Sequence, residues 1–217
     1  MSSPIHVECL IEPNYGENAL VISHSEKGPC WIVDPGLPDS VEQITRHISR
    51  NELRPQAVLV THGHLDHIAG LPELREKLGE IPIYIANEER AALTDPNENL
   101  SAGVGMPIVI GDIETRDLPA GGELTLDGVT WRILDTSGHS PGGRSFYCPD
   151  AGVVIVGDAF FQGSIGRVDF HHSNPDRLLS NIHENLLTLP GETRVYCGHG
   201  PTTTIGEEKQ HNMFLQG

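Results

Sequence analysis

The residues best suited to chemistry lie in one short stretch near position 65. Three histidines and one aspartate fall within six positions there, in the order Thr61-His62-Gly63-His64-Leu65-Asp66-His67. Imidazole nitrogen and carboxylate oxygen together suit zinc and other divalent transition metals. Because a loop can turn alternate residues toward one centre and the residues between them toward a second, the pattern indicates a metal site that could hold two ions.

This stretch and three downstream segments resemble the signature of the metallo-β-lactamase superfamily. The downstream segments are Thr136–Gly142 around His139, Val156–Phe161 around Asp158 and Tyr196–Gly200 around His199. Each follows an expected strand, in the order in which that superfamily places its remaining ligands. The resemblance therefore covers nearly the whole chain.

The resemblance implies a complete ligand set for two divalent metal ions, zinc in the first place, with iron or manganese as alternatives. The first ion would be held by His62, His64 and His139, and the second by Asp66, His67 and His199, with Asp158 bridging the two. A hydroxide shared between the ions would be the nucleophile. Asp66 and Asp158 are thus the expected catalytic carboxylates.

Within the superfamily the chain most resembles short glyoxalase II-like proteins, through the segments Gly157–Arg167 and Gly198–Glu208. The resemblance implies hydrolysis of a small thioester such as S-lactoylglutathione, whose thiolate leaves near neutral pH because its conjugate acid has a pKa of about 8.5. Glyoxalase II has a substrate-binding Lys where this chain has Arg167. We expect Arg167 to bind a substrate carboxylate or, equally, to pair with Asp169.

Full-length glyoxalase II adds a helical C-terminal domain that contacts glutathione, whereas only 18 residues follow His199 in this sequence. We expect one metallo-β-lactamase-like domain over residues 1–217, with no separate glutathione-binding helical domain. Recognition of glutathione is therefore left open.

Three other functions compete with thioester hydrolysis. A persulfide dioxygenase-like oxygenase would use one iron held by His62, His139 and Asp158. A lactonase or phosphodiesterase would use the same metals as the hydrolase. A non-catalytic binding domain is disfavoured, because a scaffold has no reason to keep both a full ligand set and an open coordination position.

The remaining histidines outside these motifs divide into two groups. Five are isolated and are expected to be solvated or structural, namely His6, His24, His47, His183 and His211. The adjacent pair His171-His172 follows the segment that carries Arg167, and the sequence assigns it no role.

The elements that must position these loops alternate between strands and helices. We expect strands at His6–Ile11, Ala19–Ser23, Cys30–Val33, Gln56–Val60, Pro82–Ala86, Glu123–Leu126, Val129–Leu134, Arg144–Cys148, Gly152–Val156 and Arg194–Cys197, and helices at Asp39–Arg50, Leu71–Leu78, Glu88–Leu93 and Pro175–Leu187. Asp39 or Ser40 is the expected cap of the first helix. The order suggests two similar halves and an α/β fold, a four-layer αββα sandwich; a three-layer α/β fold competes with it.

Composition narrows the classes of partner. The formal net charge of −16 would repel nucleic acid and anionic membranes, so a small ester or thioester is the expected partner. The N-terminus lacks the features of a secretory signal, and no apolar run reaches the about 20 residues of a membrane span. Cys9, Cys30, Cys148 and Cys197 form no CxxC pair, which predicts buried free thiols in a reducing cytoplasm. The oligomeric state is not predicted.

Overall fold

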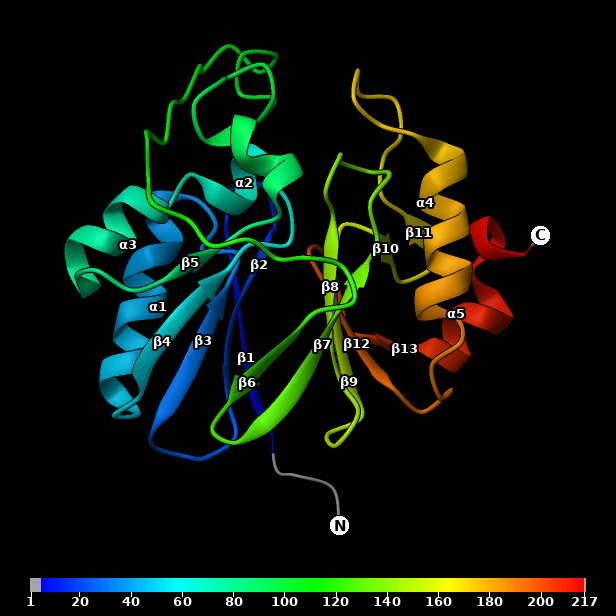
Figure 1. The fold of residues 1–217 in the computed structure, drawn as a ribbon, viewed down its shortest axis with the longest axis horizontal. Coiled ribbons are helices and arrows are strands. Elements are labelled where there is room, and N and C mark those ends of the chain that lie inside the picture. Colours follow the sequence, from blue (N-terminus) through cyan, green and yellow to red (C-terminus); the bar gives the residue numbers. More distant parts are fainter. Residues whose placement is uncertain (1–4, 217) are drawn as a thin grey trace.

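Two β-sheets lie face to face, and helices cover the outer face of each sheet (Figure 1). The computed structural model describes residues 5–216. The first sheet has the strand order β1-β2-β3-β4-β5. Its strands are β1 (His6–Ile11), β2 (Asn18–Ser23), β3 (Pro29–Val33), β4 (Arg54–Leu59) and β5 (Ile83–Tyr84). Helices α1 (Pro38–Arg50) and α3 (Leu71–Leu78) cover it.

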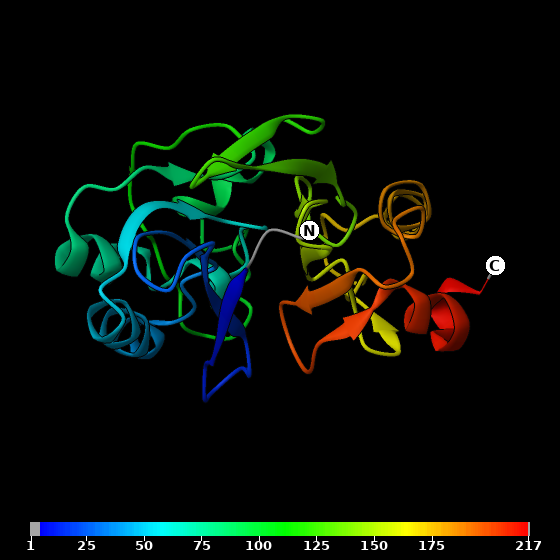
Figure 2. The ribbon, with the colours of Figure 1, turned by 90° about the horizontal axis from the view of Figure 1, so that it is seen from below.

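The second sheet has the order β13-β12-β9-β8-β7-β6. Its strands are β6 (Glu123–Leu126), β7 (Val129–Asp135), β8 (Arg144–Cys148), β9 (Val153–Gly157), β12 (Arg194–Cys197) and β13 (Thr203–Thr204). Helix α4 (Pro175–Asn181), its π-helical continuation η2 (Ile182–Leu186) and α5 (Ile205–His211) lie on the outer face, as the view from below shows (Figure 2). A small ribbon of β10 (Phe160–Phe161) and β11 (Ser164–Ile165) stands beside this sheet.

Alternation of side chains along the strands produces the four layers. In β2, Ala19 and Val21 join the apolar cluster under α1 and α3, whereas Leu20 and Ile22 face the second sheet. The cluster between the sheets also contains Trp31, Trp131 and Phe146, and a third cluster lies between the second sheet and α4, η2 and α5. Three apolar interfaces require four layers, so the αββα prediction is confirmed and the three-layer alternative is wrong.

Most of the expected strands and helices occur within one or two residues of their predicted bounds. The predicted cap of the first helix is wrong, because α1 begins at Pro38 after Leu37, and no side chain caps it. Proline suits this position because its missing N–H needs no partner in the first turn.

The remaining differences concern short elements. The helix expected at Glu88–Leu93 is the 3-10 helix η1 (Asn87–Leu93), and only two residues of the strand expected at Pro82–Ala86 pair. The unpredicted elements are α2 (Leu65–Ile68), β10, β11, β13, α5 and η3 (Met213–Leu215). All but α5 have two to four residues, too few for a hydrophobic period to show.

The thiol prediction holds for three cysteines. Cys30, Cys148 and Cys197 are free and buried, whereas Cys9 is free but exposed, because it lies on the edge strand β1. Within residues 5–216, none of the helices combines the length and the apolar character that crossing a bilayer requires.

Candidate metal centre

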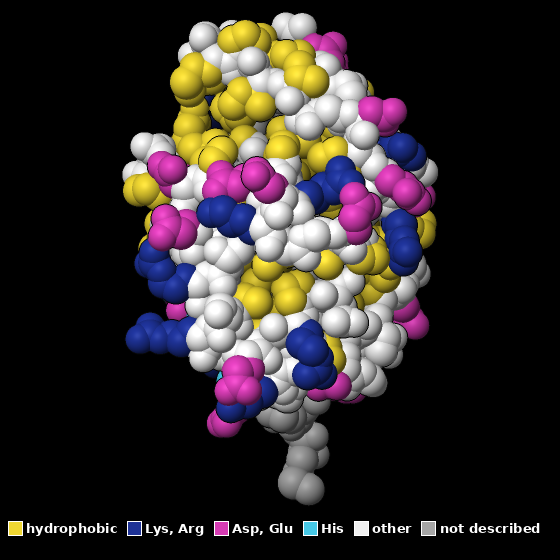
Figure 3. Space-filling model, turned by 90° about the vertical axis from the view of Figure 1, so that its left-hand side faces the viewer, with side chains coloured by type: hydrophobic (Ala, Val, Ile, Leu, Met, Phe, Trp, Pro, Cys, Tyr) yellow, Lys and Arg dark blue, Asp and Glu magenta, His cyan; other side chains and the backbone are white. Residues whose placement is uncertain are grey.

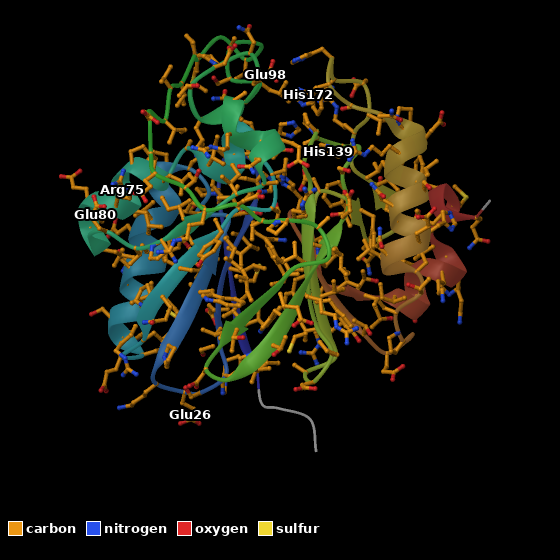
Figure 4. The ribbon with its side chains drawn as sticks, viewed as in Figure 1. Glu26, Arg75, Glu80, Glu98, His139 and His172 are labelled. Carbon is orange, nitrogen blue, oxygen red and sulfur yellow. The ribbon has the colours of Figure 1, made fainter. Side chains whose placement is uncertain are left out.

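The seven expected ligands come together at one end of both sheets. Four of them follow β4, His62 and His64 in a loop and Asp66 and His67 in the short helix α2, and single ligands follow β7, β9 and β12. Strands β7, β9 and β12 run in the same direction within their sheet, so their carboxyl ends lie at one edge. Figure 4 shows His139 at this edge, between the two halves.

The first expected set is compact and buried. His62, His64 and His139 each present a ring nitrogen within 4.8 Å of the others. His64 Nδ1 lies 2.9 Å from His139 Nε2. Two ligand atoms at about 2.0–2.1 Å from a tetrahedral zinc stand about 3.3–3.4 Å apart, so the set has nearly the spacing that one ion needs.

The second expected set lies beside the first. Asp66, His67 and His199 also present atoms within 4.8 Å of one another. Asp66 Oδ2 lies 3.2 Å from His199 Nε2 and 3.9 Å from His67 Nε2. Helix α2, which directly follows the loop of His62 and His64, therefore directs its two polar side chains toward a separate centre.

Asp158 lies between the two sets. Its Oδ1 is 3.5 Å from His67 Nε2, and its Oδ2 is 3.6 Å from both His139 Nε2 and His199 Nε2. One carboxylate thus faces a histidine of the first set and two of the second, as a bridging ligand would.

The outer ring nitrogens of three histidines have buried or backbone partners. His62 Nδ1 lies 3.0 Å from Thr61 Oγ1, and His67 Nδ1 lies 2.9 Å from Asp34 Oδ2. His139 Nδ1 lies 2.7 Å from the backbone carbonyl of Arg167 and donates to it. These contacts place the proton on Nδ1 and leave the Nε2 lone pair of each ring directed inward.

The inward atoms fit a divalent cation. Among residues 5–216, His62 Nε2, His67 Nε2 and Asp158 Oδ1 are buried and have no hydrogen-bond partner. Buried polar atoms without partners are costly, so their presence within the two ligand sets indicates that cations belong there. By contrast, Asp34, which also lies close to His62 and His67, accepts from Thr61 N and Thr61 Oγ1 at 2.7 and 2.6 Å and is already satisfied.

The histidines and aspartates of this cluster shift one another's pKa values. Burial and the neighbouring His67 and His64 lower the pKa of His62 well below its usual value. Burial also acts to lower the pKa of His67, but Asp158, Asp66 and Asp34 outweigh it and raise that pKa. Burial alone would raise the pKa of Asp66, but His67 and His199 bring it below the usual range. The Asp66 carboxylate is therefore held in its charged form, and His62 is suited to act as a neutral ligand.

Two features of the loops keep the ligands close. Glu89 is buried and accepts from the backbone N–H groups of Gly63 at 2.9 Å and Gly142 at 2.5 Å, which ties the two histidine loops together. Gly198 allows the backbone before His199 to approach Asp158, since a Cβ there would lie 2.1 Å from Asp158 Oδ1. A side chain at this position would displace the Asp158 carboxylate.

A cleft with a volume of about 310 Å³ opens over the cluster. It is lined by Tyr15, His64, Leu65, Asp66, Asn99, Leu100, Val104, His139, Asp158, Phe161, Arg167, Phe170 and His199. Val104, Met106 and Val109, from the loop after η1, are exposed, and Figure 3 shows hydrophobic side chains gathered at that upper end of the molecule. The volume suits part of a small organic molecule.

Arg167 stands at the rim of this cleft. Its guanidinium is paired with Asp169, Nε to Oδ1 at 2.9 Å and Nη2 to Oδ2 at 2.8 Å, and lies 4.5 Å from the ring centre of Phe170. Both members of the ion pair are about two-thirds exposed. Arg167 therefore both makes the expected salt bridge and lines the cleft.

Sequence reasoning missed the side chains that support the ligands. The sequence gives no role to Asp34, Glu89 or His172. His172 Nε2 lies 3.0 Å from His64 Nε2. The one available signal was position, because Asp34 directly follows a buried strand, as the motif histidines do. In the structure the φ of Asp34 is 48°, which is unusual for a residue with a side chain.

Of the isolated histidines, His24 and His47 have the structural character expected of them. His24 is buried and accepts a hydrogen bond from Trp131 Nε1 at 3.1 Å. His47 lies 3.9 Å from Glu8 on the outer side of the first sheet. Neither comes near the metal-ligand cluster.

The comparisons with known proteins agree with this geometry. Residues 14–199 match the model of the metallo-beta-lactamase superfamily. The chain is 43% identical to a probable metallo-hydrolase of Bacillus subtilis (87% of this chain, 88% of that protein) and 34% identical to the hydroxyacylglutathione hydrolase GloC of Haemophilus influenzae (97% and 98%). The solved structure of the BLEG-1 B3 metallo-beta-lactamase superposes with a TM-score of 0.90 at 37% identity, over 98% of this chain and all of that one. This chain therefore belongs to the metallo-β-lactamase superfamily.

Proposed function

We propose that the protein is a metal-dependent hydrolase that cleaves a small thioester of the hydroxyacylglutathione type. One observation carries the proposal. The outer nitrogens of His62, His67 and His139 are occupied, while their inner nitrogens converge with Asp158 at the floor of the cleft. The relative at 34% identity that is described as a hydroxyacylglutathione hydrolase, matched over almost its full length, supports this choice of substrate.

Two bound divalent cations, zinc or iron, would make a shared water basic enough to attack a carbonyl carbon and would polarise the carbonyl oxygen. The side chains of the protein would hold the cations and exclude water from the reacting bond. Asp66 and Asp158 supply the negative charge that retains the cations, and the histidines supply neutral nitrogen ligands. Leu100, Val104 and Phe170 line the cleft with apolar surface, which restricts water around the reacting bond.

Arg167 would bind a part of the substrate that lies away from the reacting bond. Its pair with Asp169 is exposed and therefore weak, so a carboxylate of the substrate can replace Asp169 at small cost. A bidentate contact of this kind would orient the thiol part of the substrate at the rim, while the acyl carbonyl lies on the floor.

Cleavage of a β-lactam is a second candidate, favoured by the likeness to the BLEG-1 structure. The two reactions differ in their leaving groups. A thiolate departs near neutral pH, because its conjugate acid has a pKa of about 8.5, whereas an amide nitrogen needs a proton as it leaves. We therefore expect thioesters to be hydrolysed faster than β-lactams.

A mononuclear iron oxygenase is less well supported than a two-ion hydrolase. It would use His62, His139 and Asp158 and would leave Asp66, His67 and His199 without a function. These three residues converge as closely as the first set.

The test combines metal analysis with a substrate panel. Protein purified without chelator should contain close to two divalent ions per chain and should hydrolyse S-lactoylglutathione faster than a chromogenic β-lactam. Oxygen consumption with glutathione persulfide should stay at background. A single iron with persulfide-dependent oxygen consumption, or a β-lactam hydrolysed faster than any thioester, would contradict the proposal.

A further inference from the structure

A second group of metal-competent side chains lies above the catalytic cluster and has no part in the hydrolysis. We call Glu98, His171 and His172 the rim cluster. Their ligand atoms lie within 4.8 Å of one another. Figure 4 shows Glu98 and His172 close together at the upper edge, from loops of the two different halves, with His139 below them.

The spacing within the rim cluster is that of ligands around one ion. His172 Nδ1 lies 3.3 Å from His171 Nε2, while Glu98 Oε1 lies 3.5 Å from His171 Nε2 and Glu98 Oε2 lies 3.9 Å from His172 Nδ1. Ligands of a tetrahedral zinc stand about 3.3–3.4 Å apart. Two imidazoles and one carboxylate also form a donor set that suits zinc, with a fourth position left for water.

The backbone on both sides of the rim cluster is fixed to the loops of the catalytic ligands. Next to Glu98, the carbonyl of Asn99 accepts from Leu65 N at 2.9 Å. Next to His172, Ser173 Oγ donates to the carbonyl of His139 at 2.7 Å. The three side chains are therefore held near one another by the same loops that form the floor, and an ion would need little further ordering.

The rim cluster also touches a catalytic ligand. His172 Nε2 lies 3.0 Å from His64 Nε2, so one of the two nitrogens carries a proton and donates it to the other. When His64 uses Nδ1 for the first ion, its proton is on Nε2 and is donated to His172. An ion at His172 Nδ1 would place a proton on His172 Nε2 as well, so two N–H groups would face each other.

We propose that Glu98, His171 and His172 form a further divalent-cation site, of zinc type, whose occupation takes away the hydrogen-bond acceptor of His64 and so lowers the activity of the ion that His64 holds. Cation binding at the rim is independent of the proposed hydrolysis, while the loss of activity rests on it. The site would slow the enzyme when free zinc is high, because the tight sites then stay filled and the rim site fills as well. Loss of an outer partner of a metal ligand typically costs 10–100-fold in metal affinity or activity, and we expect an inhibition of about that size.

The experiment titrates metal-free protein with zinc against a chromophoric chelator and counts bound ions. Wild type should bind two ions tightly and a third more weakly. His171→Ala should lose the third ion alone and keep its basal hydrolysis. His171 contacts His172, and only His172 contacts a residue of the metal-ligand cluster, His64. The exposed His183→Ala, on the outer helix, is the matched control and should bind all three.

Activity supplies the second readout. Excess zinc should slow wild type and His183→Ala about 10–100-fold and leave His171→Ala nearly unaffected. A third ion that persists in His171→Ala, or no third ion in wild type, would overturn the site. A third ion that binds without slowing hydrolysis would overturn the coupling to His64.

Asp158→Ala separates this inference from the proposed function. The variant should lose hydrolysis and tight binding but still take up one weak ion at the rim. If wild type shows no thioester hydrolysis with any metal while His171→Ala still removes one bound ion, the proposed function fails and the rim site stands.

Discussion

The floor and the rim of the cleft differ in how their polar side chains are fixed. At the floor, three histidines each contact a hydrogen-bond partner through one ring nitrogen, whereas at the rim Arg167 forms an exposed ion pair with Asp169. The floor is a network in which Asp34, Thr61 and Glu89 are themselves buried. The rim is built from half-exposed side chains of two loops. Since a buried polar group cannot exchange its partners without cost and an exposed one can, the floor fixes the chemistry and the rim can adapt to the substrate.

The largest effect should come from removing a ligand at the floor. His64→Ala or Asp158→Ala should abolish thioester hydrolysis, and elemental analysis should show reduced metal content, because each takes away a side chain directed at the cations. The loss should exceed the about 100-fold that follows removal of an outer partner. Full activity in either variant with reduced metal would contradict the assignment of the floor as the reaction centre.

A smaller but still large effect should follow from changing a buried partner. Asp34→Asn keeps the volume but removes the charge that accepts from His67 and Thr61. We expect metal affinity, measured by chelator competition, and hydrolysis to fall about 10–100-fold.

The matched control for this variant is Asp39→Asn, which changes an exposed acid in the first turn of α1. It should leave both metal affinity and hydrolysis unchanged. Equal behaviour of the two variants would mean that the buried network does not position the ligands.

The difference between floor and rim also explains what the sequence could predict. The four-residue set in the loop and helix α2 after β4 was visible because its members lie within six positions, and the single ligands at 139, 158 and 199 were identified through a family resemblance. The layers followed from the alternation of apolar residues, as in β2. These features depend on local spacing, which a sequence displays directly.

Asp34, Glu89 and His172 could not be predicted in the same way. Each acts on a residue far along the chain: Asp34 on His67, Glu89 on Gly142, and His172 on His64. Apart from the position of Asp34 directly after a strand, nothing in their local sequence distinguishes them from surface polar residues. Their roles depend on how the two halves pack, which is a property of the fold and not of any segment.

A modest effect is expected at the rim. Arg167→Ala should raise KM for a thioester that carries a carboxylate by about fivefold, equivalent to about 1 kcal/mol for an exposed charge-assisted contact, with little change in kcat. The same variant should not affect an uncharged thioester. Asp169→Asn is the control, and it should leave KM equal or lower, because it frees the guanidinium. A fall in kcat alone in Arg167→Ala would place this residue at the reacting bond and would weaken the contrast between floor and rim.

The smallest effect on hydrolysis is expected from thiol modification, which tests whether solvent reaches the floor of the cleft. Burial and nearby acids raise the pKa of the Cys197 thiol, two residues before His199, to about 12, and burial raises that of Cys30 to about 12 as well. Cys9 lies on the edge strand β1 as an exposed residue whose sulfur is only partly buried. This partial burial, together with Glu17 and Glu8, raises the pKa of the thiol, so Cys9 should react, but slowly. At neutral pH, iodoacetamide should therefore label Cys9 alone among the four, as mass spectrometry can show, and hydrolysis should be unchanged. Labelling of Cys197 in the folded protein would mean that the floor opens to solvent, and the buried network could then no longer be the reason why the ligands keep their positions.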